Sequence, residues 1–527
     1  MKVYFIAPRP DTDRERSLDG LISGKVLHVE KPFAIIAASG IATVASYFDD
    51  GFELCLCDEL IDEVDAESPA DIVCISMNVS QVARGLELAR HFRALGKVVI
   101  AGGAHVSLAP EAFEGKVDCI VAGEFEEIAE EVTGDLKRGQ LKPRYNGRKA
   151  DLSRARLPRW DLYPNDRAVW GTVQTSRGCP FECEFCDVIQ YLGRVQRHKP
   201  ADVVLRELQY LYELGYRQIH LSDDNFTVYR KRTYALLEAI AGWNGREGRE
   251  PVTFMTQASI DMARDEDLLR LCNVAGVRDV FIGLETDNEE ALRETKKRQN
   301  LNQDLVAQCE KISAAGVYLT SGMMVGFDSD RLDCFERQFA FGMSLPIVML
   351  RVTVVVASLA TPLHARMKRE GRLVGSEEGS LYVGSDLLTN IIPANMTREQ
   401  LAQGAEWLIR ELMRPENAIR RFAQLAAVLQ PAPEHLRRHG RPSQSSRAPM
   451  ELMRIASRNP DGKKVVEAVA DLSRARPEIA RDLSSLLISY LNTFVPLEKL
   501  SGGDANSRPA FMANLRHRPS VSVATVA

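Results

Sequence analysis

The sequence lacks several features that would place it in common classes of protein. It has no uninterrupted apolar run of the roughly 20 residues needed to span a bilayer. Its N-terminal stretch, MKVYFIAPRPDTDRERS, has one short apolar run followed by charges, which is typical of a first β-strand rather than a signal peptide. A formal net charge of -5 gives no excess of basic residues, so the composition does not indicate nucleic-acid binding.

Cysteine is too sparse for a disulfide scaffold, with ten residues in a chain of 527. This usage favours the reducing cytoplasm, where thiolates stay free to bind metal. Cys55 and Cys57 alternate along an expected strand, so their side chains point to opposite faces and joint metal binding is not expected.

Short apolar runs alternate with amphipathic stretches over the first part of the chain, which predicts an α/β fold with a doubly wound parallel sheet over residues 1–145. In the best amphipathic stretch, Val82, Leu86, Ala89 and Phe92 share one helical face. The expected strands are KVYFIAP (2–8), ELCLCDE (53–59), DIVCISM (71–77), KVVIAGG (97–103) and DCIVAGE (118–124).

Residues 146–170, rich in Pro, Arg and Asn, predict a linker in which Trp160 and Tyr163 are candidate packing anchors. From residue 171 the alternation resumes with six β/α units, too few for a closed eight-fold barrel, so a partial (β/α)6 barrel with a following segment is expected over 171–393. Residues 394–500 predict a helical C-terminal region, with RRHGRPSQSSRAP as an exposed loop, and residues 501–527 a disordered tail.

The strongest motif is CPFECEFC, which places Cys179, Cys183 and Cys186 within eight positions after a strand, while the next cysteine is Cys272. A structural zinc site takes four protein ligands, and a catalytic one adds histidine or carboxylate. Three thiolates suit a [4Fe–4S] cube that leaves one iron without a protein ligand, able to bind the amino and carboxylate groups of S-adenosylmethionine. The alternative is three structural cysteines among core aromatics.

With this loop, residues 170–360 resemble the radical S-adenosylmethionine superfamily. The resemblance implies that Phe185, before the last cysteine, lies near the adenine. From the residues alone, the aspartates of SDDN (222–225) would be a turn or helix cap, and the later glycines packing positions. The other contacts to S-adenosylmethionine that the resemblance implies are Asp223, Asp224, Gln257, Ser259, Glu285, Gly322 and Gly326.

Two expected strand ends in the first domain carry glycines, and no G-x-G-x-x-G follows the first strand, so a dinucleotide is disfavoured. Joined to the cysteine-containing barrel, this domain resembles the cobalamin-binding domain of class B radical methylases. The usual Asp-x-His-x-x-Gly motif is absent, which implies base-off cobalamin without a histidine on cobalt. The implied cobalamin contacts are Ser76, Met77, Asn78, Gly102, Gly103, Gly123 and Glu124.

The segment after the barrel, ASLATPLHARMKREGRL (357–373) and NIIPANMTREQL (390–401), resembles a methylase subgroup that includes hopanoid and bacteriochlorophyll methylases. A glycine is usual before the Thr-Pro of this segment, and here Ala360 takes that place.

The resemblance implies a cytoplasmic C-methyltransferase with a [4Fe–4S] cluster, S-adenosylmethionine and cobalamin, acting on an unactivated carbon of a lipid, tetrapyrrole or other natural-product precursor. Its reductant would be a protein such as flavodoxin or ferredoxin. The alternatives are a cobalamin-dependent radical cyclase or rearrangement enzyme and, in another class, an iron–sulfur electron carrier or a cobalamin sensor. For methyl transfer, the strand ends near Gly102 and Gly123 should face the barrel mouth near Cys186 across one pocket large enough for a corrin.

Overall fold

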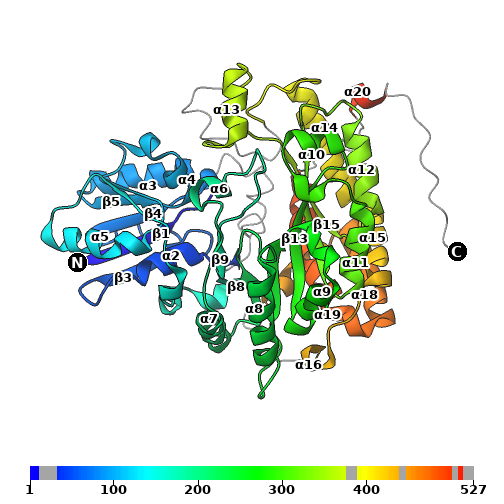
Figure 1. Cartoon of the computed structure of the whole chain (residues 1–527), viewed down its shortest axis with the longest axis horizontal. Helices are drawn as coiled ribbons and strands as arrows, with labels where there is room; N and C mark the ends of the chain where they lie inside the picture. The colour runs from blue at the N-terminus through cyan, green and yellow to red at the C-terminus, as the bar shows by residue number, and fades with distance from the viewer. Residues whose placement is uncertain (11–32, 375–388, 438–446, 501–508, 514–527) are drawn as a thin grey trace.

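The computed structural model describes residues 1–10, 33–374, 389–437, 447–500 and 509–513. Figure 1 shows an N-terminal sheet domain on one side, a second, curled sheet with its helices in the middle, and C-terminal helices packed on the far side of that sheet. The predicted α/β class, with a doubly wound first domain, a partial barrel and a helical C-terminal region, is confirmed.

The N-terminal sheet has six strands, all parallel, in the order β3-β1-β4-β5-β6-β7. Its strands are rich in Val and Ile because both faces are buried under helices. The short edge strand β7 was not among those predicted from the sequence. The bounds are β1 Lys2–Ala7, β3 Glu53–Asp58, β4 Ile72–Ser76, β5 Val98–Gly102, β6 Cys119–Ala122 and β7 Arg144–Asn146.

Helices cover both faces of this sheet. Phe5 and Val121 point to the face covered by α2 and α5, whereas Tyr4 and Val99 point to the face covered by α3 and α4. This is the doubly wound arrangement, in which ligands bind beyond the carboxyl ends of the strands. The helices are α2 Ser39–Ala45, α3 Val82–Ala94, α4 Ala104–Leu108 and α5 Ala129–Arg138, with 3-10 helices η3 Val79–Gln81, η4 Pro110–Phe113 and η5 Glu126–Ile128.

The second sheet is also parallel and has the order β15-β14-β13-β12-β11-β8-β2. Six of its strands are the six predicted barrel strands. They are β8 Ala168–Val173, β11 Gln218–Leu221, β12 Thr253–Ala258, β13 Val277–Glu285, β14 Tyr318–Val325 and β15 Met349–Val354.

The seventh strand, β2 (Ala34–Ile36), comes from within the range predicted to be the first domain. It pairs parallel to β8, with Ala34 opposite Ala168 and Ile36 opposite Trp170. The chain therefore leaves the N-terminal sheet after β1, adds an edge strand to the barrel sheet and returns through α2. Three residues carry too little periodicity for this strand to be predicted from sequence.

Helices alternate with the barrel strands and cover their outer side (Figure 1). They are α7 Ala201–Glu213, α8 Arg230–Trp243, α9 Glu266–Ala275, α10 Glu289–Glu294, α11 Leu305–Ala314 and α12 Cys334–Ser344, with η9 Ile260–Arg264 and η10 Arg298–Asn300. The loop that carries the three cysteines lies between the two antiparallel strands β9 Ser176–Arg177 and β10 Arg197–His198, and it contains α6 Val188–Tyr191.

The linker between the two sheets is anchored by its aromatic residues. Trp160 is fully buried and its ring meets that of Tyr163 edge-on, with centroids 5.5 Å apart. The Tyr163 hydroxyl donates to Asp58 Oδ2 at 2.6 Å, at the end of β3, so the linker ties the first domain to the barrel core. Three 3-10 helices lie here, η6 Leu152–Arg154, η7 Trp160–Leu162 and η8 Asn165–Arg167.

After the barrel, α13 Pro362–Arg369 precedes the helical region. The predicted exposed loop lies mostly outside the described residues, as does most of the predicted tail, although Phe511 of α20 stands edge-on to Phe335. No helix in the described ranges has the length and apolarity to cross a membrane. The helices are α14 Arg398–Met413, α15 Pro415–Val428, α16 Glu434–Arg437, α17 Arg447–Ala456, α18 Pro460–Ala475, η13 Pro477–Ile479, α19 Ala480–Leu500 and α20 Ala510–Ala513.

Candidate active site

The cysteine loop begins at Gly178, immediately after β9. Gly178 has a φ of 98°, which favours glycine, and a Cβ there would lie 2.8 Å from the Val195 oxygen and 2.9 Å from the Gly193 oxygen. The Cys179 amide donates to the Gly193 oxygen at 3.2 Å. The loop therefore closes on itself, and only glycine fits its first position.

The three loop cysteines are free thiols; Cys183 is buried, and Cys179 and Cys186 are half-buried. Burial raises the pKa of the Cys179 thiol and raises that of Cys186 to about 12, and the neighbouring cysteines add to both shifts. Among the described residues, no three histidine, cysteine or carboxylate side chains converge on one point as ligands of a single ion would. A cubane differs from a single ion because each thiolate binds a different iron, so three free thiols spread over one loop fit it.

Lys297, which the sequence analysis did not identify, lies beside this loop. Its ammonium is 2.6 Å from Glu285 Oε1 and 5.8 Å from the centre of the Phe185 ring. Burial alone would lower the pKa of Lys297, but the charges of Glu285 and of the loop thiols outweigh it and raise that pKa. Lys297 lies between α10 and η10 in the stretch KKRQN, so no local pattern marks it.

Glu285 closes strand β13 with a φ of 63°, a conformation that turns the chain sharply at the strand end. Gly322, on the neighbouring strand β14, faces the same side, because a Cβ there would lie 3.1 Å from Phe281 Cζ and 3.9 Å from Glu285 Oε2. The structure thus brings Phe185, Glu285 and Gly322 together with Lys297 at the mouth of the barrel.

Two predicted aspartates after β11 hold the cysteine loop by its backbone. Asp223 is buried, and its Oδ1 accepts the amides of Thr175 and Ser176 at 2.7 and 2.8 Å. Asp224 Oδ2 accepts the Gly178 amide at 2.7 Å, and burial raises the pKa of Asp224 to about 6. Asp223 is therefore enclosed by protein partners, whereas Asp224 also borders the cavity described below.

The remaining predicted barrel residues differ in their surroundings. Gln257 has an exposed side chain, whereas the buried Ser259 hydroxyl accepts from Asn225 Nδ2 at 3.0 Å and donates to Asp261. Gly326 has a φ of 98°, and a Cβ there would lie 2.7 Å from Leu401 Cδ2. Packing against α14 thus explains the glycine at 326 without a ligand.

One cavity of about 400 Å³ lies between the two sheets. From the first domain, it is lined by Ser76, Gly103 and Gly123 at strand ends, and by Gly40 and Thr43 of α2; from the barrel, it is lined by Thr172, Gln174, Ser222 and Asp224. Tyr191 and Leu192, which follow Cys186 in the loop, also border it. The predicted pocket shared by the two sets of strand ends is confirmed, and its volume is within the range of about 300–1,000 Å³ usual for cofactor pockets. That a corrin fits it stays a prediction.

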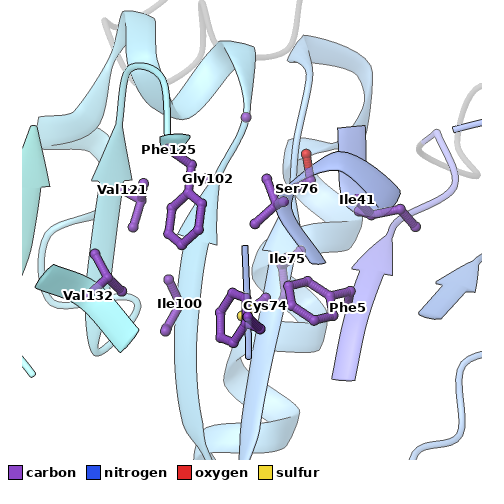
Figure 2. A pocket seen from close by; sticks show the side chains of 13 residues that line it. Phe5, Ile41, Cys74, Ile75, Ser76, Ile100, Gly102, Val121, Phe125 and Val132 are labelled. Atoms are coloured by element: carbon purple, nitrogen blue, oxygen red, sulfur yellow. The ribbon is translucent and has the colours of Figure 1, made fainter. Parts of the chain in front are cut away.

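A narrow apolar slot adjoins this cavity at Ser76 and Gly103. Figure 2 shows the side chains that line it, which come from the first-domain strands, α2 and α5 and include Phe5, Ile41, Cys74, Ile100, Val121 and Val132. Gly103 stands at the junction with a φ of 102°, and a Cβ there would lie 2.6 Å from both the amide nitrogen and the oxygen of Met77. The backbone at this junction therefore passes as closely as only glycine allows.

The seven predicted cobalamin contacts fall into three groups. Ser76, Gly102, Gly103 and Gly123 line one or both of these two cavities. Met77 is buried behind them, and Asn78 caps η3 by accepting the Ser80 amide at 3.0 Å, so neither lines the two cavities.

Glu124, the seventh, lines the larger cavity and also forms an ion-pair bridge to the barrel. Its Oε2 accepts from Arg177 Nη1 at 2.8 Å, and its Oε1 from Arg197 Nη2 at 2.6 Å. Burial alone would raise the pKa of Glu124, but Arg197 and Arg177 together hold it below its usual value. Because both arginines lie on the β9–β10 pair at the base of the cysteine loop, this bridge fixes the first domain against the loop. No local sequence pattern marks either arginine for this role.

Comparisons with known proteins agree with this arrangement. A model of the radical SAM superfamily matches residues 173–337, and one described as a domain of unknown function, DUF4070, matches residues 361–459. An uncharacterised methyltransferase of Synechocystis sp. is 33% identical over 374 residues, which cover 70% of this chain and 69% of that protein. The hopanoid C-2 methylase of Rhodopseudomonas palustris is 28% identical over 349 residues, 65% of this chain and 66% of that protein.

Among solved structures, the radical S-adenosylmethionine methyltransferase TsrM of Kitasatospora setae, with cobalamin and a [4Fe–4S] cluster bound, shares the fold. Its TM-score is 0.60 at 14% identity, over 90% of this chain and 99% of that one. The chain is thus a radical S-adenosylmethionine enzyme. It belongs to a family of radical S-adenosylmethionine methyltransferases, whose cofactors include a [4Fe–4S] cluster and S-adenosylmethionine.

Proposed function

We propose that this protein is a C-methyltransferase that places a methyl group on an unactivated carbon of a lipid, tetrapyrrole or other natural-product precursor. The observation that carries the proposal is the single cavity bordered by both sets of strand ends. A radical that had to diffuse between separate pockets would be quenched, so methyl donor, substrate and radical source need one enclosed space.

The cysteine loop supplies the donor set for the cluster, with Cys179, Cys183 and Cys186 as ligands. When bound, the cluster and S-adenosylmethionine supply a 5′-deoxyadenosyl radical, and cobalamin supplies the methyl group. The Lys297 ammonium, held by Glu285, offsets the negative charge that three thiolates bring to a partly buried site.

For S-adenosylmethionine, we propose five residues as direct contacts. Asp224 borders the cavity, Gln257 has an exposed side chain, and Phe185, Glu285 and Gly322 lie together beside Lys297. We propose no direct contact for the other three predicted residues. The polar groups of Asp223 and Ser259 are already bonded to other protein groups, and Gly326 packs against Leu401.

For cobalamin, the cavity walls at Ser76, Gly103 and Gly123 would hold the corrin, and the apolar slot would take the nucleotide tail of the base-off form. A slot lined by Phe5, Ile100 and Val121 suits an aromatic base, because binding would remove apolar surface of both the slot and the base from water. Gly102 lines the slot and its oxygen accepts the Met77 amide, so Gly102, Met77 and Asn78 would act on cobalamin through the backbone beside the slot.

A hopanoid methylase among the relatives supports a large, apolar substrate. The electron for each turnover would come from a reducing partner such as flavodoxin or ferredoxin. All ten cysteines are free thiols, which is in keeping with a cytoplasmic location.

Iron analysis and product analysis test the proposal. The anaerobically reconstituted protein should hold four irons, lose them on Cys179→Ala, Cys183→Ala or Cys186→Ala, and keep them on the control Cys272→Ala, because Cys272 lies in the barrel core. Four irons retained without any one of the three loop thiols would refute the cluster assignment. Reduction should then cleave S-adenosylmethionine, which an electron carrier would not do. With a candidate substrate, a methylated product distinguishes the methylase from a cyclase or rearrangement enzyme.

Cobalamin binding is tested by filling the cavity. Gly40 lines it, and a Cβ there would meet no atom within 4 Å, so Gly40→Trp should add a large side chain at the cavity wall and lower bound cobalamin by about tenfold or more. Gly242→Trp, on α8 and equally free of neighbours, should bind as the wild type does. If the wild type takes up no cobalamin, the proposal reduces to a cobalamin-free radical enzyme.

A further inference from the structure

Glu184 lies between Cys183 and Phe185, and every polar group it has is bonded to another segment of the protein. Its amide donates to the Thr295 oxygen at 2.9 Å, and its own carbonyl accepts the Leu363 amide at 3.1 Å. Its carboxylate is buried. The second half of the cysteine loop is therefore fixed through Glu184 from outside the loop.

Arg366 on α13 supplies the partner for that carboxylate. Its Nε donates to Glu184 Oε1 at 2.9 Å and its Nη2 to Oε2 at 3.0 Å, a two-bond pairing that sets orientation as well as distance. Arg366 Nη1 also donates to Asp328 Oδ2 at 2.5 Å, and Asp328 in turn accepts from Arg372. Arg366 thus joins the cysteine loop to the turn after strand β14, and Arg372 binds the same aspartate.

The helix that carries Arg366 is itself firmly placed. Thr361 caps α13 by accepting the His364 amide at 3.1 Å, and Pro362 occupies its first turn. Leu363 and Met367 are buried in a small apolar cluster with Ala291 and Phe327, against which Phe185 packs. The same helix therefore contacts the cysteine loop through both an ion pair and an apolar surface.

We propose that the segment 361–374, the first part of the region that matches a domain of unknown function, is a clamp on the cysteine loop, with Arg366 as its positioning residue. The clamp holds Cys183 and Cys186 on either side of a fixed Glu184, so the loop is ordered before a cluster binds. Ligands that are already ordered bind without a further entropy cost. The role as a cluster loop rests on the function proposed above, whereas the clamp itself is a property of the protein chain.

The first test follows thiol reactivity in the full-length, cluster-free protein. Arg366→Gln should raise the rate at which iodoacetamide alkylates the buried Cys183 by about tenfold or more, because local opening of the loop becomes easier. Glu184→Gln should do the same, Arg366→Lys should fall between it and the wild type, and Arg369→Gln, at an exposed position of the same helix, should change nothing. Cys272, buried in α9, reports global unfolding and should stay slow.

Unchanged Cys183 reactivity in both Arg366→Gln and Glu184→Gln, or a parallel rise of Cys272 in both, would overturn the clamp. The second test uses the reconstituted protein, in which Arg366→Gln should alter the electron paramagnetic resonance spectrum of the reduced cluster and speed iron loss to a chelator about tenfold. Partial recovery is expected in Arg366→Lys. A spectrum and an iron-release rate equal to those of the wild type would overturn the positioning role. If the wild type forms no cluster, the proposed function fails, and the alkylation rates still decide the clamp.

Discussion

At the scale of single residues, a few backbone positions adopt conformations that most side chains avoid. Ala360 has a φ of 63° immediately before the helix cap Thr361, which explains why a glycine is usual before the Thr-Pro of this segment. A left-handed conformation costs a residue with a Cβ about 1–2 kcal/mol. Alanine at this position therefore keeps the conformation that glycine would adopt, at the cost of backbone strain.

Ala360→Gly should accordingly stabilise the protein by up to about 1 kcal/mol, because relief of the strain exceeds the extra freedom that glycine gains in the unfolded chain. The midpoint of urea unfolding of the full chain should rise. Ala365→Gly, at an exposed position inside α13, should lower it by a comparable amount, since there glycine only loses helix propensity. A lowered midpoint for Ala360→Gly would contradict the assignment of strain.

Asp279 near the start of β13 predicts a pH dependence. Burial raises the pKa of Asp279 to about 7, and Thr320 Oγ1 is 3.2 Å from its Oδ1. The pKa of an unfolded aspartate is about 3.9, so between about pH 4 and 7 the folded state binds more protons at this position and stability falls as pH rises. Asp279→Asn should flatten the stability profile in that window.

Thermal midpoints from pH 4 to 8 give the measurement, with the exposed Asp267→Asn of α9 as the matched control. Other raised carboxyl pKa values, such as that of Asp224, persist in both variants and cancel in the comparison. Parallel profiles for the wild type and Asp279→Asn would show that Asp279 does not titrate there.

At the scale of elements, strand β2 joins two parts of the chain that the sequence assigns to different domains. The Ala37 amide that follows it donates to the Trp170 oxygen at 3.0 Å, and the Ala37 oxygen accepts from the Thr172 hydroxyl at 3.0 Å. Because Thr172 lines the shared cavity while α2 lines its opposite wall, β2 sets the spacing between those walls.

Ala37→Pro should loosen that connection, because proline removes the donor to Trp170, and the expected cost is about 1–3 kcal/mol. Hydrogen exchange measured by mass spectrometry should increase over β8 and α2 and little elsewhere. Ser39→Pro, at the first position of α2 where proline is tolerated, serves as the control. Equal exchange in both variants would mean that β2 does not hold the two parts together.

At the scale of the whole molecule, the cavity exists only because the first domain is held in one orientation over the barrel. Glu124 with Arg177 and Arg197, together with Tyr163 bonded to Asp58, makes that connection. The first domain therefore meets the cysteine loop through charged groups, and the linker ties it to the barrel core.

Glu124→Gln should weaken this orientation, because it leaves two arginines near a neutral amide; removal of one partner from a buried ion pair costs about 3–5 kcal/mol. We expect faster hydrogen exchange in the β9–β10 pair and in residues 147–152, where the Ala150 amide donates to Glu124. Glu130→Gln, exposed on α5, should leave exchange unchanged. Equal hydrogen exchange in Glu124→Gln and Glu130→Gln would contradict the role of Glu124 as a bridge.

The sequence by itself determined the α/β class, the six barrel strands and the cysteine loop, because buried strands, amphipathic helices and closely spaced ligands leave local patterns. It also marked Gly103 and Gly123, since left-handed backbone and close approach select glycine. Only the tertiary structure showed that β2 joins the barrel, that Glu124 is an ion-pair bridge, and that Lys297 and Arg366 lie at the cysteine loop. These contacts join residues far apart in the chain, and the energy of such a pair depends on distances that no local pattern encodes.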